Sequence, residues 1–397
     1  MKVKMEELRD AVNSVSATKS QITMAVDNEQ KVGTFVSTDS QMGIKVMTRF
    51  PYTGSFEETD SIYMAAGLNE RVNALAPYGD SVNIVKANNM LKFVAGEAKF
   101  NVGMLNDKPA DIATGEQIGV YQISGKEFLF AMGQTNYAPT INLIFKKDEL
   151  IICALTDYRI SAVTVPVLRS DVPDFSVEDT DDKPEEMKRR VDLVIDSTNF
   201  IVDEDRGEFM TAISKDVWSR ISSICKDEYF CIFVYDNQLQ FVWNKVAISL
   251  PITPVVKGDM NFVRKTSTEA TKTENSIEFD VNSKTVLDAL NLVSISGETE
   301  VNFRGDDGEL EIYTLSGSAK IKAAGVTEFS QTYNGKHMKG ILSINKNTDL
   351  KVIVEGPILI MDFCKEFEHC FDEKEPLKNK LDVHILVIGK GNGSQQE

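Results

Sequence analysis

A strand, a tight polar turn and a second strand recur three times along this chain of 397 residues. The recurring stretches are SVNIVKANNMLKFVAGEAKFNVG at Ser81–Gly103, YFCIFVYDNQLQFVWNKVAISLP at Tyr229–Pro251 and TEVNFRGDDGELEIYTLSGSAKIKAAG at Thr299–Gly325. A short amphipathic helix pattern precedes alternating strands twice within each third of the chain. Repeats determine an architecture, because each unit buries its apolar face against its neighbours. The recurrence predicts three similar α+β units, built as a segment of a ring, whose function resides in shape rather than in a catalytic pocket.

Six helices are predicted from apolar residues that lie three and four positions apart. The predicted helices are Met5–Lys19, Ala65–Pro77, Ser124–Ala138, Ile213–Lys226, Val281–Ser296 and Tyr333–Lys346. Asn282 or Ser283 is expected to cap the fifth of them, because short polar side chains bind the free N–H groups of a first turn.

Polar segments separate the predicted units. Asn106–Gly119 contains a proline and is predicted to be a linker, and so is Lys257–Asn275, which is rich in Thr, Lys and Ser. Asp171–Lys188 is acidic and is predicted to be a solvated loop. The chain then divides into domains at 1–118, 119–258 and 274–390, followed by a tail at 391–397 that is expected to be disordered.

Composition limits the classes of protein that remain. An apolar fraction of 42% is enough for a sizeable core. No apolar run is long enough to cross a membrane, and the N-terminus MKVKMEELRD lacks the apolar stretch of a signal peptide. We therefore expect a cytoplasmic protein. The net charge of −17 argues against nucleic acid in sum, although binding depends on where the charges lie.

The cysteines do not indicate a disulfide framework. Three of the five fall in apolar patterns and are predicted to be buried thiols, namely Cys153, Cys225 and Cys231. A reducing compartment fits this usage. The spacing of Cys364, His369 and Cys370 matches no common zinc site, so no metal is expected.

Positive charge is concentrated on the predicted helices. These six helices sum to +4, which leaves −21 on the rest of the chain. The contrast has two interpretations, ordinary solvated helix faces or one shared, mildly basic surface that follows phosphates without reading bases. The candidate phosphate-facing residues are Lys19, Arg71, Lys126, Lys215, Arg220, Lys226, Lys284, Lys336, Lys339 and Lys346.

Several stretches, in this order, resemble the bacterial-type DNA sliding clamp, the β subunit of DNA polymerase III. They are Ala65–Leu105, Phe128–Val167, Val286–Phe303 and Tyr333–Phe363. Within the second of them, TDYRIS at Thr156–Ser161 stands where that family carries Thr-Asp-Gly-x-Arg-Leu. The likeness covers most of the chain, and its weight lies in the order and spacing of the stretches.

The resemblance implies an α+β fold of three repeated clamp domains, each with two helices on antiparallel sheets. It also implies a homodimer that closes head to tail into a ring around double-stranded DNA, independently of base sequence. Such a ring has no catalytic activity and no cofactor. It is a processivity factor, loaded by a clamp loader, that keeps the replicative DNA polymerase at high local concentration.

The family's partner pocket lies between the second and third domains and accepts a short hydrophobic peptide. The residues that match it are Thr156, Arg159, Ile160, Pro254, Asn334, His337, Pro357, Ile358, Val387 and Ile388. Ile295 matches a position of the dimer interface.

The sequence also departs from the family. TDYRIS is one residue shorter than the motif and has Tyr158, and the chain ends in HILVIGKG followed by further residues. These departures suggest a divergent clamp, such as one from a phage or a plasmid. An interaction scaffold with the clamp fold that does not encircle DNA is the alternative function.

An enzyme is not favoured by the sequence. No Ser or Cys motif stands beside any of the three histidines, and no Gly-x4-Gly-Lys-Ser/Thr loop is present. The acidic run at Glu178–Glu186 could bind a hard cation, but a solvated loop is the simpler interpretation.

Overall fold

The computed structural model describes residues 1–56, 61–173, 184–224, 229–255, 273–294, 299–369 and 377–390. The fold is α+β, as predicted. Seven α-helices lie in the described residues, namely α1 (Met5–Ser16), α2 (Leu68–Leu75), α3 (Gly125–Thr135), α4 (Glu185–Ile195), α5 (Lys215–Ile221), α7 (Ser283–Val293) and α8 (Gly335–Ile344). All except α4 fall inside the six predicted ranges.

Helix α4 corrects the predicted loop at Asp171–Lys188, because the helix begins at Glu185. Polar residues dominate its sequence, and Val194 is its one buried residue. Ion pairs attach it to the body. Arg189 binds Glu116 at 2.6 Å, and Arg190 binds Asp171 at 3.1 Å. Val191 and Leu193 also pack against the main core beside Val194, so apolar contacts hold the helix as well.

Side-chain caps begin four of the helices. Ser124 accepts a hydrogen bond from the N–H of Glu127 in α3, and Ser214 accepts one from Asp216 in α5. Asn282 does the same for α7, which confirms one of the two predicted caps, and Asn334 does so for α8. Each cap satisfies an N–H group that has no partner within its own helix.

Three units of strands follow the repeats. The first unit contains β1 (Lys2–Lys4), β2 (Ile22–Asp27), β3 (Val32–Asp39), β4 (Ile44–Pro51), β5 (Ile62–Met64), β6 (Ser81–Ala87), β7 (Met90–Ala95) and β8 (Ala98–Leu105). The second contains β9 (Gln117–Ser124), β10 (Thr140–Phe145), β11 (Glu149–Thr156), β12 (Arg159–Pro166), β13 (Arg169–Asp171), β14 (Ile201–Asp203), β15 (Glu208–Ser214), β16 (Tyr229–Tyr235), β17 (Gln238–Trp243) and β18 (Val246–Pro251). The third contains β19 (Ile277–Asn282), β20 (Glu300–Asp306), β21 (Glu309–Tyr313), β22 (Ser318–Lys322), β23 (Phe329–Asn334), β24 (Asp349–Glu355), β25 (Ile358–His369) and β26 (Leu377–Ile388).

Two seams join the units into continuous antiparallel sheets. At the first seam β18 pairs with β4, with Ile248 opposite Val46. At the second seam β26 pairs with β12, with Leu386 opposite Ile160. In both seams the last strand of one unit pairs with the third strand after the first helix of the preceding unit. The same pairing rule is therefore used twice within one chain.

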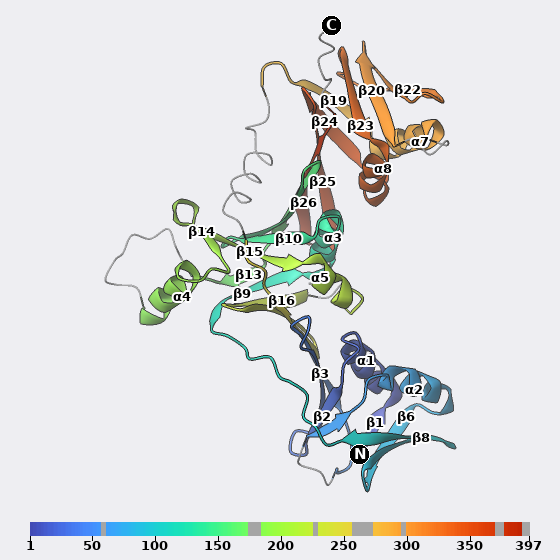
Figure 1. The fold of residues 1–397 in the computed structure, drawn as a ribbon, viewed down its shortest axis with the longest axis vertical. Helices are drawn as coiled ribbons and strands as arrows, with labels where there is room; N and C mark the ends of the chain where they lie inside the picture. Colours follow the sequence, from blue (N-terminus) through green and yellow to red (C-terminus); the bar gives the residue numbers. More distant parts are fainter. Residues whose placement is uncertain are drawn as a thin grey trace.

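The chain forms an arc with its helices on one side (Figure 1). Helices α1, α2, α3, α5, α7 and α8 lie on the concave side of the sheets, whereas α4 lies on the opposite side. We call the sheet face that points away from the six helices the outer face. The apolar core lies between the six helices and the sheets and includes large, fully buried rings such as those of Phe128 and Phe241.

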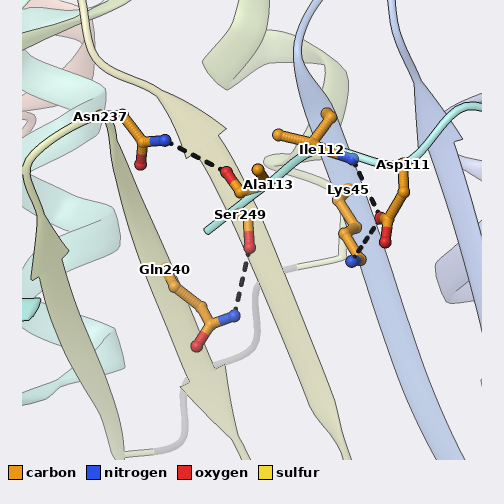
Figure 2. Close-up of polar contacts among 7 residues, drawn as sticks. All are labelled: Lys45, Asp111, Ile112, Ala113, Asn237, Gln240 and Ser249. Atoms are coloured by element: carbon orange, nitrogen blue, oxygen red, sulfur yellow. Dashed lines mark hydrogen bonds and ion pairs between the residues drawn. The ribbon is translucent and has the colours of Figure 1, made fainter. Parts of the chain in front are cut away.

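The linker after β8 crosses the outer face at the first seam (Figure 2). Lys45 of β4 binds Asp111 at 2.6 Å. The Asn237 amide, in the turn between β16 and β17, donates to the carbonyl of Ala113 at 3.1 Å. Because these contacts come from both sides of the seam, the linker holds the first two units together in addition to the sheet pairing.

Candidate functional site

The concave side holds the predicted phosphate-facing residues that the structure describes. Lys226 lies outside the described residues. Exposed side chains are those of Lys19, Arg71, Lys126, Lys284, Lys336 and Lys346, and half-buried ones are those of Lys215, Arg220 and Lys339. All nine lie on the six concave helices or in the residues that follow them directly.

The charge contrast is smaller than the sequence predicted. With the observed helix ends, α1 carries −2, α5 carries +1, α8 carries +2, and α2, α3 and α7 are balanced. The six helices therefore sum to +1 instead of +4. The difference arises because Lys19 and Lys346 follow the ends of α1 and α8, and Lys226 follows α5.

An acidic cleft lies between α1 and the turn that joins β17 to β18. It has a volume of about 280 Å³ and is lined by Glu6, Glu7 and Asp10. Lys245 closes one side and binds Glu7 at 2.6 Å. Arg49 also lines this cleft, so three acids face two cations there, whereas α8 carries two lysines and no acid.

An apolar row crosses the second seam on the outer face. The strand register places Ile160 opposite Leu386, Leu386 opposite Ile360, and Ile360 opposite Ile353. These four side chains form one cluster and are only 3 to 7% exposed. The half-buried side chains packed against it are those of Leu155, Ile358 and Ile388.

The structure brings together three of the predicted pocket residues and separates one. Ile160, Ile358 and Ile388 join the apolar row. Val387 faces the opposite side of the sheet, where it is 2% exposed within the main core. Leu386 occupies the outer face instead, and the prediction missed it together with Ile353 and Ile360. The alternation of side chains along a strand is the signal that pairs Leu386 with Ile388 and excludes Val387.

Arg159 has a structural position beneath this row. Its side chain is buried, and its guanidinium lies 3.9 Å from the centroid of the Tyr137 ring. It donates to the Ser161 hydroxyl and to the backbone carbonyl of Gln134. Burial lowers the pKa of Arg159 to about 10, which still leaves it charged at neutral pH. Thr156 holds the same turn, because its hydroxyl bonds both the N–H and the carbonyl of Arg159.

Tyr158 and His337 form an aromatic contact across the second seam. Their ring centroids are 4.1 Å apart, and Tyr158 is 41% exposed. The backbone carbonyl of Tyr158 accepts a hydrogen bond from the N–H of Ile388. Burial, together with the nearby charges of Arg159 and Lys336, lowers the pKa of His337. The residue that departs from the family motif therefore contacts the predicted residue of α8.

The other predicted pocket residues lie at the edges of the site. The Asn334 side chain caps α8 by accepting from the N–H of His337 at 3.1 Å. Pro357 is exposed in the turn between β24 and β25, and its carbonyl accepts from Gly389 at 2.7 Å. Pro254 is exposed and follows the bridge between Thr253 and Ala212. Ile295, the predicted interface residue, lies outside the described residues.

The described residues contain neither a cluster of metal ligands nor a helix that could span a membrane. Within them, no group of three or more His, Cys, Asp or Glu side chains is placed to hold a metal ion, and no helix is long and apolar enough to cross a membrane. Cys364 is exposed and donates to Asp382 at 3.0 Å, whereas Cys370 lies outside the described residues. Cys153 is buried, but Cys231 is half-buried, which corrects the prediction for that thiol; Cys225 is not described.

Comparison with known proteins supports the fold through structure and not through sequence. No protein-family model and no curated protein matches the sequence. The DNA polymerase sliding clamp from Bacillus subtilis matches with a TM-score of 0.70 at 17% identity, over 98% of both chains. The Helicobacter pylori β clamp in complex with carprofen matches with a TM-score of 0.73 at 11% identity, over 98% of this chain and 99% of that chain.

A third solved structure agrees with these two. The DNA polymerase III β subunit from Thermotoga maritima matches with a TM-score of 0.69 at 10% identity, over 98% of both chains. Because the matches span almost the whole chain, the expectation of a clamp fold is confirmed: this chain has the fold of the DNA polymerase III β sliding clamps.

Proposed function

We propose that the chain is a DNA sliding clamp, a non-catalytic processivity factor that closes around duplex DNA as a homodimer. One observation carries the proposal: two strands of the kinds that pair at the seams have no seam partner within this chain. Each seam uses the last strand of a unit and the third strand after the first helix of the unit before it. No seam uses β8, which is the last strand of the first unit, or β22, which is the third strand after the first helix of the third unit.

Both leftover strands have a free edge in the described part of the chain. β22 pairs with β21, at the end of its sheet. β8 pairs with β7 along its length, and β5 covers just its last two residues, Met104 and Leu105. Free edges invite pairing with another chain. If β22 of one copy pairs with β8 of another, two copies close a ring of six units with no such edge left.

Exposed apolar side chains lie close to the free edge of β22. Leu292 on α7 is 61% exposed, and Leu315, in the turn that leads into β22, is fully exposed. The Thr314 hydroxyl donates to the carbonyl of Val293, which holds that turn against the end of α7. These side chains would be buried by a neighbouring subunit, which supports association at this end of the chain.

The concave side would then face DNA. In a closed ring, its basic side chains would surround the duplex and contact phosphates, which carry no sequence information. Affinity of this kind is sequence-independent and salt-sensitive. We assign the three clamp domains to 1–118, 119–258 and 274–390, and place the protein in the cytoplasm.

The apolar row and the Tyr158–His337 pair form the proposed partner site on the second seam. We propose that the replicative DNA polymerase and the clamp loader insert a short hydrophobic peptide there. The half-buried Ile358 and Ile388 offer the apolar contact, and the backbone of Tyr158 is joined to it by the hydrogen bond from the N–H of Ile388.

Retention on circular DNA tests the proposal. The protein is loaded onto a nicked circle and passed through a gel-filtration column, before and after the circle is linearised. A sliding ring stays on the circle and is lost from the linear form. Equal retention on both forms would contradict encirclement and favour the alternative, an interaction scaffold with the clamp fold.

A further inference from the structure

The six concave helices differ in the charge of their first turns. In the second and third units, every one of these helices has a lysine in its first turn, namely Lys126 in α3, Lys215 in α5, Lys284 in α7 and Lys336 in α8. In the first unit, the first turns contain glutamates, namely Glu6 and Glu7 in α1 and Glu70 in α2.

A lysine in a first turn opposes the dipole of its own helix. The N-terminal end of a helix carries partial positive charge, so a cation there lowers helix stability and a carboxylate raises it. The glutamates of α1 and α2 are therefore explained by helix stability alone. The four lysines are not.

These lysines also have no ion-pair partner among the described residues. Two of the four helices carry an acid in the same turn, but neither acid neutralises its lysine. Glu127 in α3 is fully buried and accepts from the Asn379 amide, and Asp216 in α5 forms no ion pair with Lys215 in the described structure. Cations without ion-pair partners on four helices of one concave side, three of them exposed and Lys215 half-buried, suit a polyanion.

The cations of the first unit either form hydrogen bonds within the protein or lie beside a larger number of acids. Arg71 donates to the backbone carbonyl of Asn101 at 2.9 Å, and Arg9 donates to the Asn73 amide at 3.1 Å. The cleft at the first seam sets three acids of α1 against Arg49 and Lys245, so its lining is acidic by one charge. Lys19 is left as an exposed cation at the end of α1.

We propose that the second and third units contact the DNA phosphates, while the first unit does not. This inference rests on the proposed function. A ring of two chains would then hold the duplex at two opposite pairs of units, separated by the two first units. The assignment removes Lys19 and Arg71 from the predicted phosphate contacts and keeps those of the second and third units, namely the four first-turn lysines, Arg220, Lys339 and Lys346, with Lys226 outside the described residues.

Two matched double variants test the inference. Lys284→Glu with Lys336→Glu reverses two cations of the third unit, and Lys19→Glu with Arg71→Glu reverses two of the first. The equilibrium Kd for a fluorescent 30-base-pair duplex is measured at several salt concentrations for the full chain and both variants. Each phosphate contact contributes about 0.9 to the magnitude of the slope of log affinity against log salt. The third-unit variant loses two lysines per subunit, so the magnitude of its slope should fall by about 2 for each subunit.

The outcomes separate the inference from the proposed function. A first-unit variant with an unchanged slope, next to a third-unit variant with a reduced one, supports the inference. Equal losses in both variants, or a larger loss in the first-unit variant, overturn it. Thermal unfolding and gel-filtration mass, compared with the unaltered chain, show that each variant is folded and equally assembled. Retention of the unaltered chain on circular DNA decides the proposed function separately.

Discussion

Gln134 and Asn345 exchange two side-chain hydrogen bonds across the second seam. The Gln134 amide donates to Asn345 Oδ1 at 2.7 Å, and the Asn345 amide donates to Gln134 Oε1 at 3.0 Å. Both residues are buried, although 211 positions separate them in the sequence. Their backbone carbonyls are also used, one by Arg159 and the other by Ser283. The ends of α3 and α8 are therefore joined where the second and third units meet.

Removing one partner of this pair should destabilise the fold. Gln134→Leu leaves the buried Oδ1 of Asn345 without a donor, although the Asn345 amide still donates to the Ile341 carbonyl, and this costs about 1 to 3 kcal/mol. Urea unfolding of the single variant measures the loss. Replacing both residues by leucine removes both polar groups and should recover part of the stability. A double variant that loses more stability than the two single variants lose together would show that the amide pair is not the cause of the single-variant losses.

The half-buried isoleucines of the second seam should matter for partner binding. We expect Ile358→Ala with Ile388→Ala to weaken binding of a labelled hydrophobic peptide from the cognate polymerase at least tenfold, because both side chains border the apolar row. Fluorescence anisotropy measures the affinity.

Val387→Ala is the matched control for that experiment. Val387 faces the main core, so its truncation should cost about 1 to 3 kcal/mol of stability while peptide affinity remains within twofold. Loss of peptide binding in the Val387 variant alone would place the partner site on the other face of the sheet.

Leucines beside the free edge of β22 should hold two chains together. Leu292→Glu with Leu315→Glu places two charges on side chains that the structure leaves exposed, so the folded monomer should lose less than about 0.5 kcal/mol. We expect sedimentation equilibrium to shift from dimer toward monomer mass.

Ile195→Glu is the control for the association experiment, because Ile195 is 48% exposed on α4, which lies away from the concave side. It should leave the mass unchanged. An unchanged mass in the leucine variant would argue against association through this end of the chain.

His384 and Asp362 should make stability depend on pH. His384 Nδ1 lies 2.8 Å from Asp362 Oδ1 on the outer face. The hydrogen bond to Asp362 raises the pKa of His384 and outweighs the opposing effect of burial. The folded pKa therefore exceeds the ordinary value near 6.5. The stabilisation is fully present below about pH 6.5 and is lost as the pH rises through the folded pKa.

Urea unfolding from pH 5 to pH 9 checks this prediction. The stability difference between the unaltered chain and His384→Gln should shrink as the pH rises. Asp362→Asn should remove the same dependence, because it removes the charged partner. A difference that stays constant across the range would show that this pair does not couple stability to pH.

The helices of this fold were predictable because their signals are local. Apolar spacing and caps such as Asn282 involve residues no more than about four positions apart, so six helices fell within their predicted ranges. Helix α4 was missed because its first turn belongs to the acidic run at Glu178–Glu186, whose charge indicates a solvated loop. Met187, Val191 and Val194 do lie at helical spacing.

The candidate site was predicted in part, and its errors have a common cause. The closing strand reads Ile385-Leu386-Val387-Ile388, so it is apolar on both faces. A strand of this kind has no polar alternation to show which residues point outward. Alternation places Leu386 on the same face as Ile388, and the register with β12 puts Leu386 opposite Ile160 in the outer row.

By itself, the sequence determined the number of repeats, the element types, most helix positions and the turns, because these follow from residues close together along the chain. Only the tertiary structure decided which strands meet at the seams, which side of β26 faces outward, the contact of Tyr158 with His337, and the two edges left free at β8 and β22. Those features depend on contacts between residues that are far apart in the sequence. The free energy of such contacts is gained only when the units pack together, so no local pattern in the sequence indicates it.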